Sequence, residues 1–318
     1  MRTRPALAYV MSGWTLDAWI DAMQRLDPGL DLRTHPNGLG RREDIGYALA
    51  WRPEPHVLET LPNLKAVFSL GAGVDAILSD PTLPDVPVVR IVDPDMTMRM
   101  SEFVVMHVLL HHRQQKRIDE NQRAKRWDNF PTHAASALKV GIMGFGVLGQ
   151  NAGRKLKDLG FDVASWSRTP KKVSGVASFT GENELDAFLA RSDVLVVLLP
   201  HTPETTGFIN RALLRKLSRS GPFGAPILIN AGRGKVHVER DVIAALEAGE
   251  LHAASLDVFE EEPLPRDSPL WTHPCVYVSS HGAADSDPLT ISRNILQQIE
   301  RYENGGRLEN VVDRGRGY

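Results

Sequence analysis

The 318-residue sequence contains one cysteine and no long run of apolar residues. A single cysteine, Cys275, excludes an intrachain disulfide, which is typical of proteins kept in a reducing compartment. Its apolar neighbours in CVYV favour a packed thiol over a nucleophile. No stretch is long enough for a transmembrane helix, and the apolar run in the N-terminal segment MRTRPALAYVMSGW is too short for a signal peptide. We therefore expect a cytoplasmic protein with no membrane partner.

The sequence also lacks a strong excess of charge of either sign. It has 37 Lys and Arg against 39 Asp and Glu, a formal net charge of −2 at pH 7. Such a balance gives no long-range attraction to nucleic acid, so we expect no nucleic-acid partner. Hydrophobic residues at 42% and charged residues at 24% are ordinary for a globular protein, and the length allows two domains.

A recognisable metal-binding motif is missing as well. His107 and His111 are one helical turn apart, a spacing that can chelate a metal, but no HExxH motif or carboxylate cluster accompanies them. We expect no metal site and interpret both histidines as interface or surface residues. They belong to a long helix predicted from about Ser101 toward Arg126, after a loop at 94–98. Its apolar first half and polar second half fit a helix that links two domains and meets a partner subunit.

Short apolar runs rich in β-branched residues alternate with helical patterns along the chain. The predicted strands are 6–11, 45–51, 64–70, 86–92, 138–143, 161–166, 194–199, 226–230, 251–258 and 275–279. Outside the long helix and the glycine motif, the predicted helices are 16–26, 55–61, 74–78, 211–217, 238–248 and 289–302. This alternation predicts parallel α/β sheets. The last helix should pack against the first one, so no new domain begins at the loop before it.

A glycine motif, GFGVLG, joins the predicted strand at 138–143 to a helical pattern, and a second predicted strand follows. The order strand, glycine turn, helix, strand separates a dinucleotide-binding fingerprint from chance glycines. In that fingerprint Gly144 permits a tight turn, Gly146 lets the backbone approach a pyrophosphate, and Gly149 lets helix and strand pack closely. The N-terminus of the helix favours phosphate through its unpaired N–H groups and its dipole.

The residues after the second strand of this motif indicate which dinucleotide binds. An NAD-binding protein usually has Asp or Glu at this strand end, but Ser167 and Arg168 occupy it, and Asp162 lies at the other end of the strand. A hydroxyl and a guanidinium suit a 2′-phosphate, so the sequence predicts NADPH, with NADH as a weaker cofactor. The turn continues with Thr169, Lys171 and Lys172. The alternative is a solvent-exposed basic turn.

The first hundred residues have no GxGxxG motif, so we expect them to bind something other than the dinucleotide. Within them, SLGAGVD directly follows a predicted strand. The small residues Gly71, Ala72 and Gly73 expose backbone N–H groups at the carboxyl end of a parallel strand, where open α/β sheets bind ligands. A small carboxylate can dock there. The alternative is a plain tight turn.

Three predicted strands of the second half are each followed by a polar residue suited to catalysis: Arg233 in NAGRG, Glu262 in DVFEEEPLP and His281 in SSHGAA. Parallel strands would bring all three to the sheet edge that carries the glycine loop. Reduction of a 2-oxo acid by hydride needs a proton donor, a role that histidine fills near pH 7. A paired carboxylate fixes the histidine tautomer, and an arginine binds the substrate carboxylate. The alternatives are a surface arginine, a solvated glutamate run and a core or rim histidine.

Over nearly its whole length the chain resembles the D-isomer-specific 2-hydroxyacid dehydrogenases. The matching segments, in family order and spacing, are GFGVLG, LLPHTPETTGFI, LINAGRGKVHVERDVIAALEAGEL, ASLDVFEEEPLP and SSHGAA. The resemblance implies an α/β fold of two Rossmann-like or flavodoxin-like domains with parallel sheets. The substrate domain would comprise residues 1–100 and 285–318, and the NAD(P)-binding Rossmann domain, residues 101–284, would be inserted into it. The resemblance also implies a homodimer that uses the helix after Ser101.

The same resemblance assigns roles to individual residues. It implies that Arg233, Glu262 and His281 form the catalytic set, Glu262 being the glutamate directly before Pro263. It implies that the backbone of the loop 71–73 holds the substrate carboxylate. For the cofactor site, the matched segments add Val147, Leu148, Leu199, Pro200, Thr205 and Ala231, together with Asp257, which would face the nicotinamide amide.

Within the family the chain is most similar to the bacterial type A group of glyoxylate/hydroxypyruvate reductases. The cues are WRP at Trp51, LGAGVD, DPDMTMRMSEFV and the ending ENVVDRGRGY. That group's preference for NADPH agrees with Ser167 and Arg168. Trp51 would form a wall of the substrate pocket, the alternative being a core aromatic at a strand end. Ser280 replaces a proline that many relatives have before the histidine, which can alter the approach angle of His281.

These features predict an NADPH-dependent reductase of glyoxylate and hydroxypyruvate. Two other hypotheses remain open. One is an NAD(H)-linked dehydrogenase for a bulkier D-2-hydroxy acid, and the other is a dinucleotide-sensing module on the same fold. The complete set of arginine, glutamate and histidine favours turnover, because a sensor needs the cofactor site alone.

Overall fold

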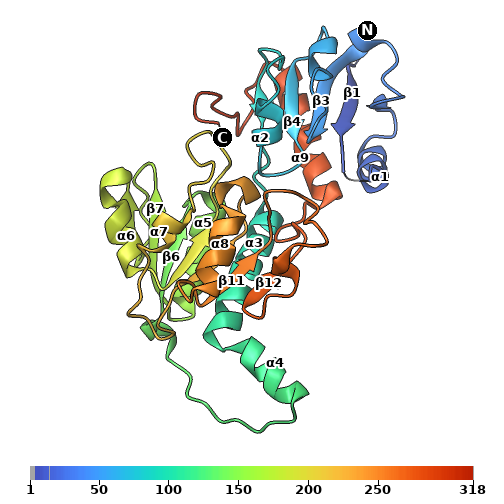
Figure 1. Ribbon diagram of the computed structural model, residues 1–318. Coiled ribbons are helices and arrows are strands. Elements are labelled where there is room, and N and C mark those ends of the chain that lie inside the picture. The colour runs from blue at the N-terminus through green and yellow to red at the C-terminus, as the bar shows by residue number, and fades with distance from the viewer. Residues whose placement is uncertain (1–3, 14, 318) are drawn as a thin grey trace. The chain divides into compact units, whose positions relative to one another are not determined.

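The computed structural model describes residues 4–13 and 15–317. Residues 1–3 and Trp14, in the N-terminal segment considered above, and the final Tyr318 lie outside the described residues. The chain divides into two compact units, coloured by residue number in Figure 1. Unit 1 comprises Met1–Met96 and Ser286–Tyr318, and unit 2 comprises Thr97–Asp285. Unit 2 is therefore inserted, in sequence, between two parts of unit 1.

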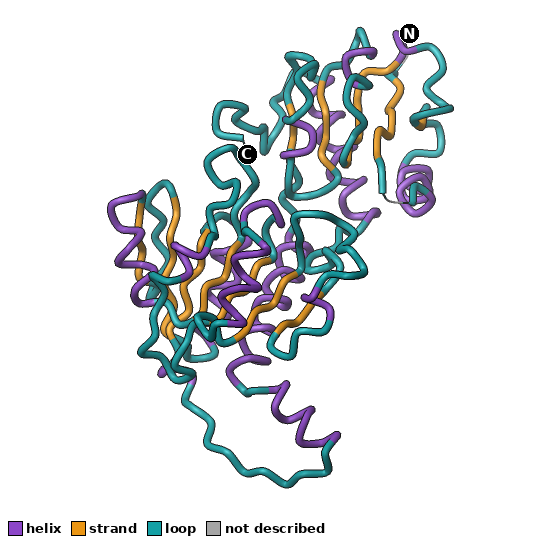
Figure 2. The backbone as a smooth tube through the Cα atoms, viewed as in Figure 1, coloured by secondary structure: helices purple, strands orange, loops and turns teal. Residues whose placement is uncertain are grey.

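Unit 1 contains a five-stranded parallel sheet in the order β2-β1-β3-β4-β5 (Figure 2). The strands are β1 (Ala6–Met11), β2 (Leu32–Thr34), β3 (Ile45–Trp51), β4 (Ala66–Ser69) and β5 (Val88–Val89). Alternate residues of β1 face opposite sides, with Tyr9 in one hydrophobic cluster and Val10 in the other. Both faces of this sheet are therefore covered, as expected for parallel strands.

The first and last helices of unit 1 cover the same face of its sheet. Helix α1 spans Asp17–Leu26, the short helix α2 spans Asp75–Leu78, and α9 spans Pro288–Glu303. Trp19 and Met23 of α1 share a buried cluster with Ile291 and Ile295 of α9. The prediction that the last helix packs against the first is confirmed. Helix α9 begins where the side chain of Asp287 accepts the N–H of Thr290.

Unit 2 contains a seven-stranded parallel sheet in the order β12-β11-β10-β9-β6-β7-β8. The strands are β6 (Lys139–Met143), β7 (Asp162–Ser167), β8 (Ala177–Thr180), β9 (Val194–Val197), β10 (Ile227–Asn230), β11 (Ala253–Leu256) and β12 (Val276–Val278). With two parallel sheets in an α/β chain, the predicted fold class is confirmed. Because all strands run the same way, the loops after their carboxyl ends emerge at one edge.

Helices cover both faces of the unit 2 sheet. They are α3 (Pro94–His112, which starts in unit 1), α4 (Gln115–Arg123), α5 (Val147–Asp158), α6 (Leu185–Arg191), α7 (Arg211–Leu214) and α8 (Glu239–Glu247). Buried residues of α3 and α5, such as Val104 and Leu156, share one cluster, and those of α6 and α8, such as Phe188 and Val242, share the other. No helix within the described ranges is long and apolar enough to cross a membrane.

The long helix predicted from Ser101 toward Arg126 is wrong at both ends. Helix α3 already begins at Pro94, because proline suits a first helical turn and the carboxylate of Asp93 accepts the N–H of Met96 at 2.8 Å. It ends at His112, and Gln114 departs from the helical conformation with a left-handed φ of 54°. The polar residues that follow form the separate helix α4.

His107 and His111 are not surface residues, which corrects the interpretation from the sequence. Both side chains are buried in unit 2, and both contact the hydroxyl of Ser255 on β11. Nδ1 of His107 and Nε2 of His111 each lie 2.8 Å from Ser255 Oγ. Since the hydroxyl has one proton, it donates to one imidazole and accepts from the other. Burial lowers the pKa of His107 to about 4 and that of His111 to about 3.

These lowered pKa values predict a stability loss in mild acid. Between about pH 6.5 and pH 3, unfolded His111 binds a proton that the folded protein excludes, so the free energy of unfolding falls as the pH falls through this window. The slope is at most about 1.4 kcal/mol per pH unit for each histidine. His111→Gln keeps a hydrogen bond to Ser255 and cannot titrate, so its melting temperature should depend less on pH than that of the wild type.

The measurement is the melting temperature by calorimetry from pH 8 to pH 4. His56→Gln serves as the control, because His56 is an exposed histidine and its side chain contacts Glu59 at the surface. Parallel curves for the wild type and His111→Gln would contradict the assignment of the acid sensitivity to this buried group.

Candidate active site

The three glycines of the motif occupy the turn between β6 and α5. Gly144 has a φ of 98°, and a Cβ atom there would lie 2.6 Å from the backbone of Leu198. A Cβ atom at Gly149 would lie 2.3 Å from the carbonyl oxygen of Gly144, so the helix cannot approach the turn with any larger residue. Around Gly146, by contrast, the described residues leave the Cβ position open to 4 Å. This position has room for a ligand beside the backbone.

The N-terminus of α5 has donors for an anion. Its N-cap is Gly146, which offers no side-chain oxygen to the first turn. The N–H groups of Val147, Leu148 and Gly149 have no partner within the helix, as in the first turn of any α-helix. They lie at the positive end of a twelve-residue helix dipole. The free N–H groups of this turn therefore suit a pyrophosphate group.

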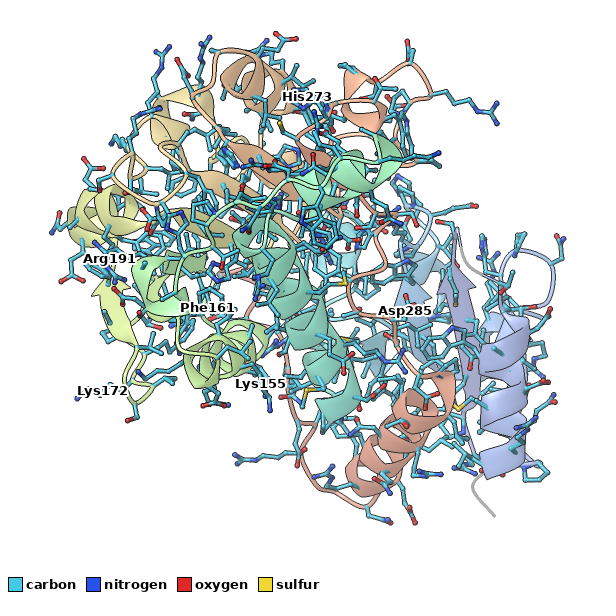
Figure 3. The ribbon with its side chains drawn as sticks, turned by 90° about the horizontal axis from the view of Figure 1, so that it is seen from below. Lys155, Phe161, Lys172, Arg191, His273 and Asp285 are labelled. Carbon is cyan, nitrogen blue, oxygen red and sulfur yellow. The ribbon has the colours of Figure 1, made fainter. Side chains whose placement is uncertain are left out.

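The end of β7 has a guanidinium and no carboxylate. Arg168 is exposed directly after the strand. The Ser167 hydroxyl donates to the carbonyl oxygen of Thr169 at 2.8 Å, so its proton is already used within the turn. Asp162 lies at the opposite end of β7 and pairs with Arg191, labelled in Figure 3, at 2.7 Å. Of the two groups predicted to bind a 2′-phosphate, Ser167 thus has its proton engaged within the turn, whereas the guanidinium of Arg168 lies at the surface.

The segment after β9 is fixed by its own side chains. Thr205 donates through Oγ1 to the carbonyl oxygen of Pro200 at 2.8 Å and accepts the N–H of Thr202 at 2.8 Å. Leu199 lies directly against the loop after β10, because a Cβ atom at Gly232 would be 2.7 Å from the Leu199 carbonyl oxygen. The predicted cofactor residues of this segment thus form a rigid wall beside the next loop.

The loop after β10 contains Arg233 and packs against the loop after β11. Arg233 is half-buried, and its Nη1 donates to the carbonyl oxygen of Gly232 at 2.9 Å. A Cβ atom at Gly234 would lie 1.7 Å from the carbonyl oxygen of Phe259, so only glycine allows this contact. Ala231, predicted at the cofactor site, is buried at the start of the loop. Neighbouring strands thus place the Arg233 and Glu262 loops side by side.

Glu262 and His281 are joined by a side-chain hydrogen bond. His281 Nδ1 lies 2.8 Å from Glu262 Oε2, with 27% and 17% of the two side chains exposed. The other oxygen, Oε1, accepts the N–H of Phe259 at 3.1 Å. The carboxylate of Glu260 instead accepts the N–H of Glu239 at 2.7 Å. The structure therefore brings together the same glutamate and histidine that the sequence paired.

This pair leaves one nitrogen of the imidazole available. An ionised carboxylate only accepts hydrogen bonds, so the proton on His281 Nδ1 points to Glu262. Nε2, the other ring nitrogen, is then the atom that can exchange a proton with a ligand. The arrangement suits general acid–base catalysis.

Asp257 holds the loop that contains His281, a role that the sequence did not indicate. His281 has a left-handed φ of 56°, and its N–H donates to the Asp257 carbonyl oxygen at 2.8 Å. The carboxylate of Asp257 is 1% exposed and accepts hydrogen bonds from Ser279 Oγ at 2.7 Å and from the N–H groups of Gly282 and Ala283 at 3.0 Å each. These bonds join residues more than 20 positions apart, so no local motif reveals them.

In unit 1, the loop after β4 offers backbone donors. Ser69 Oγ bonds to the N–H of Gly71 at 3.3 Å and lies within 3.0 Å of the Gly73 carbonyl oxygen, which fixes the loop. The described residues supply no acceptor for the N–H groups of Ala72 and Gly73. A Cβ atom at Gly71 would lie 2.1 Å from the ring of Trp51, so the half-buried indole lies directly over the loop. These N–H groups suit a small anion.

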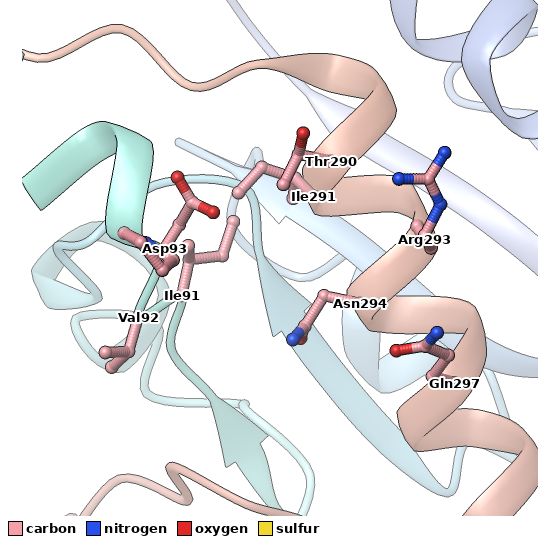
Figure 4. A pocket seen from close by; sticks show the side chains of 9 residues that line it. Ile91, Val92, Asp93, Thr290, Ile291, Arg293, Asn294 and Gln297 are labelled. Carbon is pink, nitrogen blue, oxygen red and sulfur yellow. The ribbon is translucent and has the colours of Figure 1, made fainter.

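Unit 1 also has a pocket of about 190 Å³ beside α9 (Figure 4). Its walls are Ile91, Val92, Asp93 and Pro94 and, on the first turns of α9, Thr290, Ile291, Arg293, Asn294 and Gln297. None of the site residues predicted from the sequence lines it. In the part of the chain that the structure describes, no group of three or more His, Cys, Asp or Glu residues is arranged to hold a metal ion.

Comparison with known proteins places this site in a family. A family model described as D-isomer specific 2-hydroxyacid dehydrogenase, NAD binding domain, matches residues 73–283, well over half of the chain. The chain belongs to the D-isomer specific 2-hydroxyacid dehydrogenase family. The family and the enzyme class predicted from the sequence, an NAD(P)-dependent 2-hydroxyacid dehydrogenase, are thereby confirmed.

Several members of this 2-hydroxyacid dehydrogenase family are similar to the chain over its whole length. The glyoxylate/hydroxypyruvate reductase A of Yersinia enterocolitica is 40% identical over 94% of this chain and 96% of its own. The NADPH-dependent glyoxylate/hydroxypyruvate reductase of Sinorhizobium meliloti, solved with NADP and sulfate, is 44% identical with a TM-score of 0.94, covering 99% of this chain and 100% of that one. A Xanthobacter autotrophicus member solved with NADPH and MES is 42% identical, with a TM-score of 0.93 and the same coverage.

Proposed function

We propose that this dehydrogenase reduces small 2-oxo acids, glyoxylate and hydroxypyruvate among them, to 2-hydroxy acids with NADPH. The observation that carries the proposal is the Glu262–His281 pair at 2.8 Å, on a loop held by the buried Asp257. The named activity of the relatives from Yersinia enterocolitica and Sinorhizobium meliloti supports the choice of substrates. A sensor would need no such acid–base pair.

In this proposal each residue has a stated task. Bound NADPH supplies the hydride. Reduction of the carbonyl develops negative charge on its oxygen, and His281 Nε2 donates a proton to that oxygen while Glu262 holds Nδ1. The guanidinium of Arg233 binds the substrate carboxylate and polarises the carbonyl. Within unit 1 itself, the N–H groups of Ala72 and Gly73 suit a small carboxylate.

The proposed cofactor fits residues at three strand ends. The turn 144–149 holds the pyrophosphate on the N–H groups of α5, and Arg168 binds the 2′-phosphate. Leu199, Pro200, Thr205 and Ala231 supply the rest of the cofactor site. Two of the similar structures contain NADP or NADPH, which supports this choice. Both carboxylate oxygens of Asp257 are engaged by the loop after β12, so we assign Asp257 primarily to holding that loop and only secondarily to the nicotinamide amide.

The acid–base assignment predicts a specific loss of turnover. His281→Ala should lower kcat/KM for glyoxylate by about 10²- to 10⁴-fold, the usual contribution of a general acid, while the Kd for NADPH stays within about twofold. Glu262→Gln should lower kcat/KM for glyoxylate by a smaller factor. The imidazole keeps its place but loses the neighbouring negative charge that stabilises its protonated form. The measurement is loss of NADPH absorbance with a panel of 2-oxo acids.

His252→Ala is the matched control, since this exposed histidine precedes β11 at the end opposite to Glu262. A His281→Ala variant that reduces glyoxylate at the wild-type rate would remove the assignment. Wild-type protein that binds NADPH but turns over no 2-oxo acid would favour the sensor hypothesis, and a preference for bulky substrates with NADH would favour the other dehydrogenase.

The assignment of Arg168 predicts a cofactor-specific effect. Arg168→Ala should lower kcat/KM for NADPH by about 10- to 100-fold, since a hydrogen bond to a charged group contributes about 1.5–3 kcal/mol. The value for NADH, which has no 2′-phosphate, should change by less than about threefold. Arg240→Ala controls for the loss of an exposed arginine elsewhere in unit 2, because Arg240 is 89% exposed. Equal losses with both cofactors would contradict the assignment.

We also propose that the protein is a homodimer built on the segment from α3 through α4 to the loop before β6. Large apolar side chains are exposed along it: Met106 at 48%, Ile118 at 39% and Trp127 at 100%. In Figure 1, α4 and the green loop after it extend away from the remainder of unit 2. A fully exposed tryptophan is unusual in a monomer and typical of an interface.

The dimer proposal predicts a mass of about twice 35.2 kDa by light scattering. Trp127→Asp places a charge in the proposed interface, so it should shift the protein toward the monomer, whereas Trp271→Asp, at another exposed tryptophan in unit 2, should not. A monomeric wild type at the concentrations used for assay would overturn the proposal.

A further inference from the structure

We infer that Asn230 and His237 are positioning residues that set the orientation of Arg233, and that His237 does so by accepting a hydrogen bond from Asn230. The inference rests on the proposed function, in which Arg233 binds the substrate carboxylate. Neither Asn230 nor His237 needs to touch substrate or cofactor for this role. They act on the backbone on both sides of the arginine.

Asn230, the last residue of β10, binds the Arg233 loop with every polar atom of its side chain. It is fully buried. Its Oδ1 accepts the N–H of Gly232 at 3.0 Å, and its Nδ2 donates to the carbonyl oxygen of Arg233 at 3.1 Å and to Nδ1 of His237 at 2.8 Å. Because an N–H faces one end of the amide and a carbonyl oxygen faces the other, the orientation of the Asn230 amide is fixed.

His237 connects this amide to a rigid part of unit 2. The backbone on both sides of the histidine pairs with the segment at 207–209: Ile209 N–H donates to the carbonyl oxygen of Val236 at 2.9 Å, and Val238 N–H donates to that of Ile209 at 3.1 Å. The imidazole is buried, and its Nδ1 contacts Asn230 at the end of β10. Asn230 is therefore held from both sides, by its own strand and by the histidine.

The chemistry of the imidazole supports a positioning role. Since the Asn230 amide donates to it, Nδ1 must carry a lone pair, so His237 is neutral with its proton on Nε2. Burial lowers the pKa of His237 to about 4, which keeps that form present at neutral pH. Nε2 is buried and finds no acceptor among the described residues. An unpaired buried N–H at Nε2 lowers stability. The hydrogen bond that Nδ1 accepts from Asn230 is therefore the contribution that we assign to His237.

The loop between these two residues has almost no freedom to adjust. Gly232 lies against the carbonyl oxygen of Leu199, and Gly234 lies against that of Phe259. The same Phe259 donates its N–H to Glu262, the partner of His281. A rotation of the Asn230 amide would therefore move the Arg233 backbone within a packed space, and the guanidinium would move with it.

The test compares two substitutions of His237 that differ in one acceptor. His237→Asn places a carbonyl oxygen where Nδ1 was. His237→Gln places its amide one bond further out, so the N–H of Asn230 that His237 accepted loses its acceptor, while the other still donates to the Arg233 carbonyl oxygen. We expect His237→Gln to raise KM for glyoxylate about tenfold or more, with KM for NADPH within about twofold, and His237→Asn to stay within about threefold of the wild type. His111→Leu, which removes another buried histidine of unit 2, should leave both KM values within about twofold.

A double-mutant cycle with Arg233→Lys tests whether the effect of His237 on substrate binding passes through Arg233. If His237 acts through the arginine, His237→Gln should change KM for glyoxylate by less than about twofold in the Arg233→Lys background. Equal effects of His237→Gln in both backgrounds, or equal KM values for His237→Gln and His237→Asn, would overturn the inference. Tm values measured for all variants show that each is folded.

Binding of oxamate, a carboxylate that is not reduced, separates this inference from the proposed function. The Kd of oxamate for the complex with NADP⁺ should rise about tenfold in His237→Gln and stay near the wild-type value in His237→Asn. If the wild type reduces no 2-oxo acid but the oxamate pattern holds, the proposed reaction fails and the positioning role stands. If the wild type is active and the oxamate Kd is the same in all variants, the positioning role fails alone.

Discussion

The hydrogen bonds that the buried carboxylate of Asp257 accepts hold the candidate active site of unit 2 in place. It accepts three hydrogen bonds from the loop after β12, and its backbone oxygen accepts the N–H of His281. A carboxylate with 1% exposure is tolerated only because these donors replace the water it has lost. The N–H of Asp257 in turn donates to the carbonyl oxygen of Asn230 at 3.0 Å. Asp257 therefore hydrogen-bonds both to the loop that contains His281 and to the strand residue that precedes the Arg233 loop.

This arrangement explains how a histidine stays in a left-handed conformation. A non-glycine residue with φ near 56° costs of the order of 1–3 kcal/mol, and it persists only where the surroundings over-determine it. Here the N–H groups of His281, Gly282 and Ala283 all donate to Asp257. The strained backbone turns the imidazole toward Glu262. The position of the Glu262–His281 pair thus depends on these backbone hydrogen bonds as well as on the hydrogen bond between the two side chains.

Much of the fold follows from local pattern, and the failures have physical causes. Strands β1 and β3 have the predicted bounds because both are apolar runs buried on both faces. Strands β2 and β8 were not predicted, since they are short edge strands without a buried apolar run. The first turns of α3 were mistaken for a loop, although Asp93 before Pro94 is a helix start. Within the site, the glycine turn and the Glu262–His281 pair were predictable from type and spacing, whereas the role of Asp257 requires partners distant in sequence.

The histidines show why residue type alone is a poor guide to role. His107, His111 and His237 are buried with lowered pKa values, and each serves as a neutral hydrogen-bonding group. His281 differs in having a carboxylate at 2.8 Å on Nδ1 and a partly exposed ring. A histidine can exchange a proton with a substrate near neutral pH only where burial does not exclude its charged form and its second nitrogen can reach the substrate. The partner atom and the exposure, which only the folded chain provides, therefore distinguish His281 from the buried imidazoles as the candidate for acid–base chemistry.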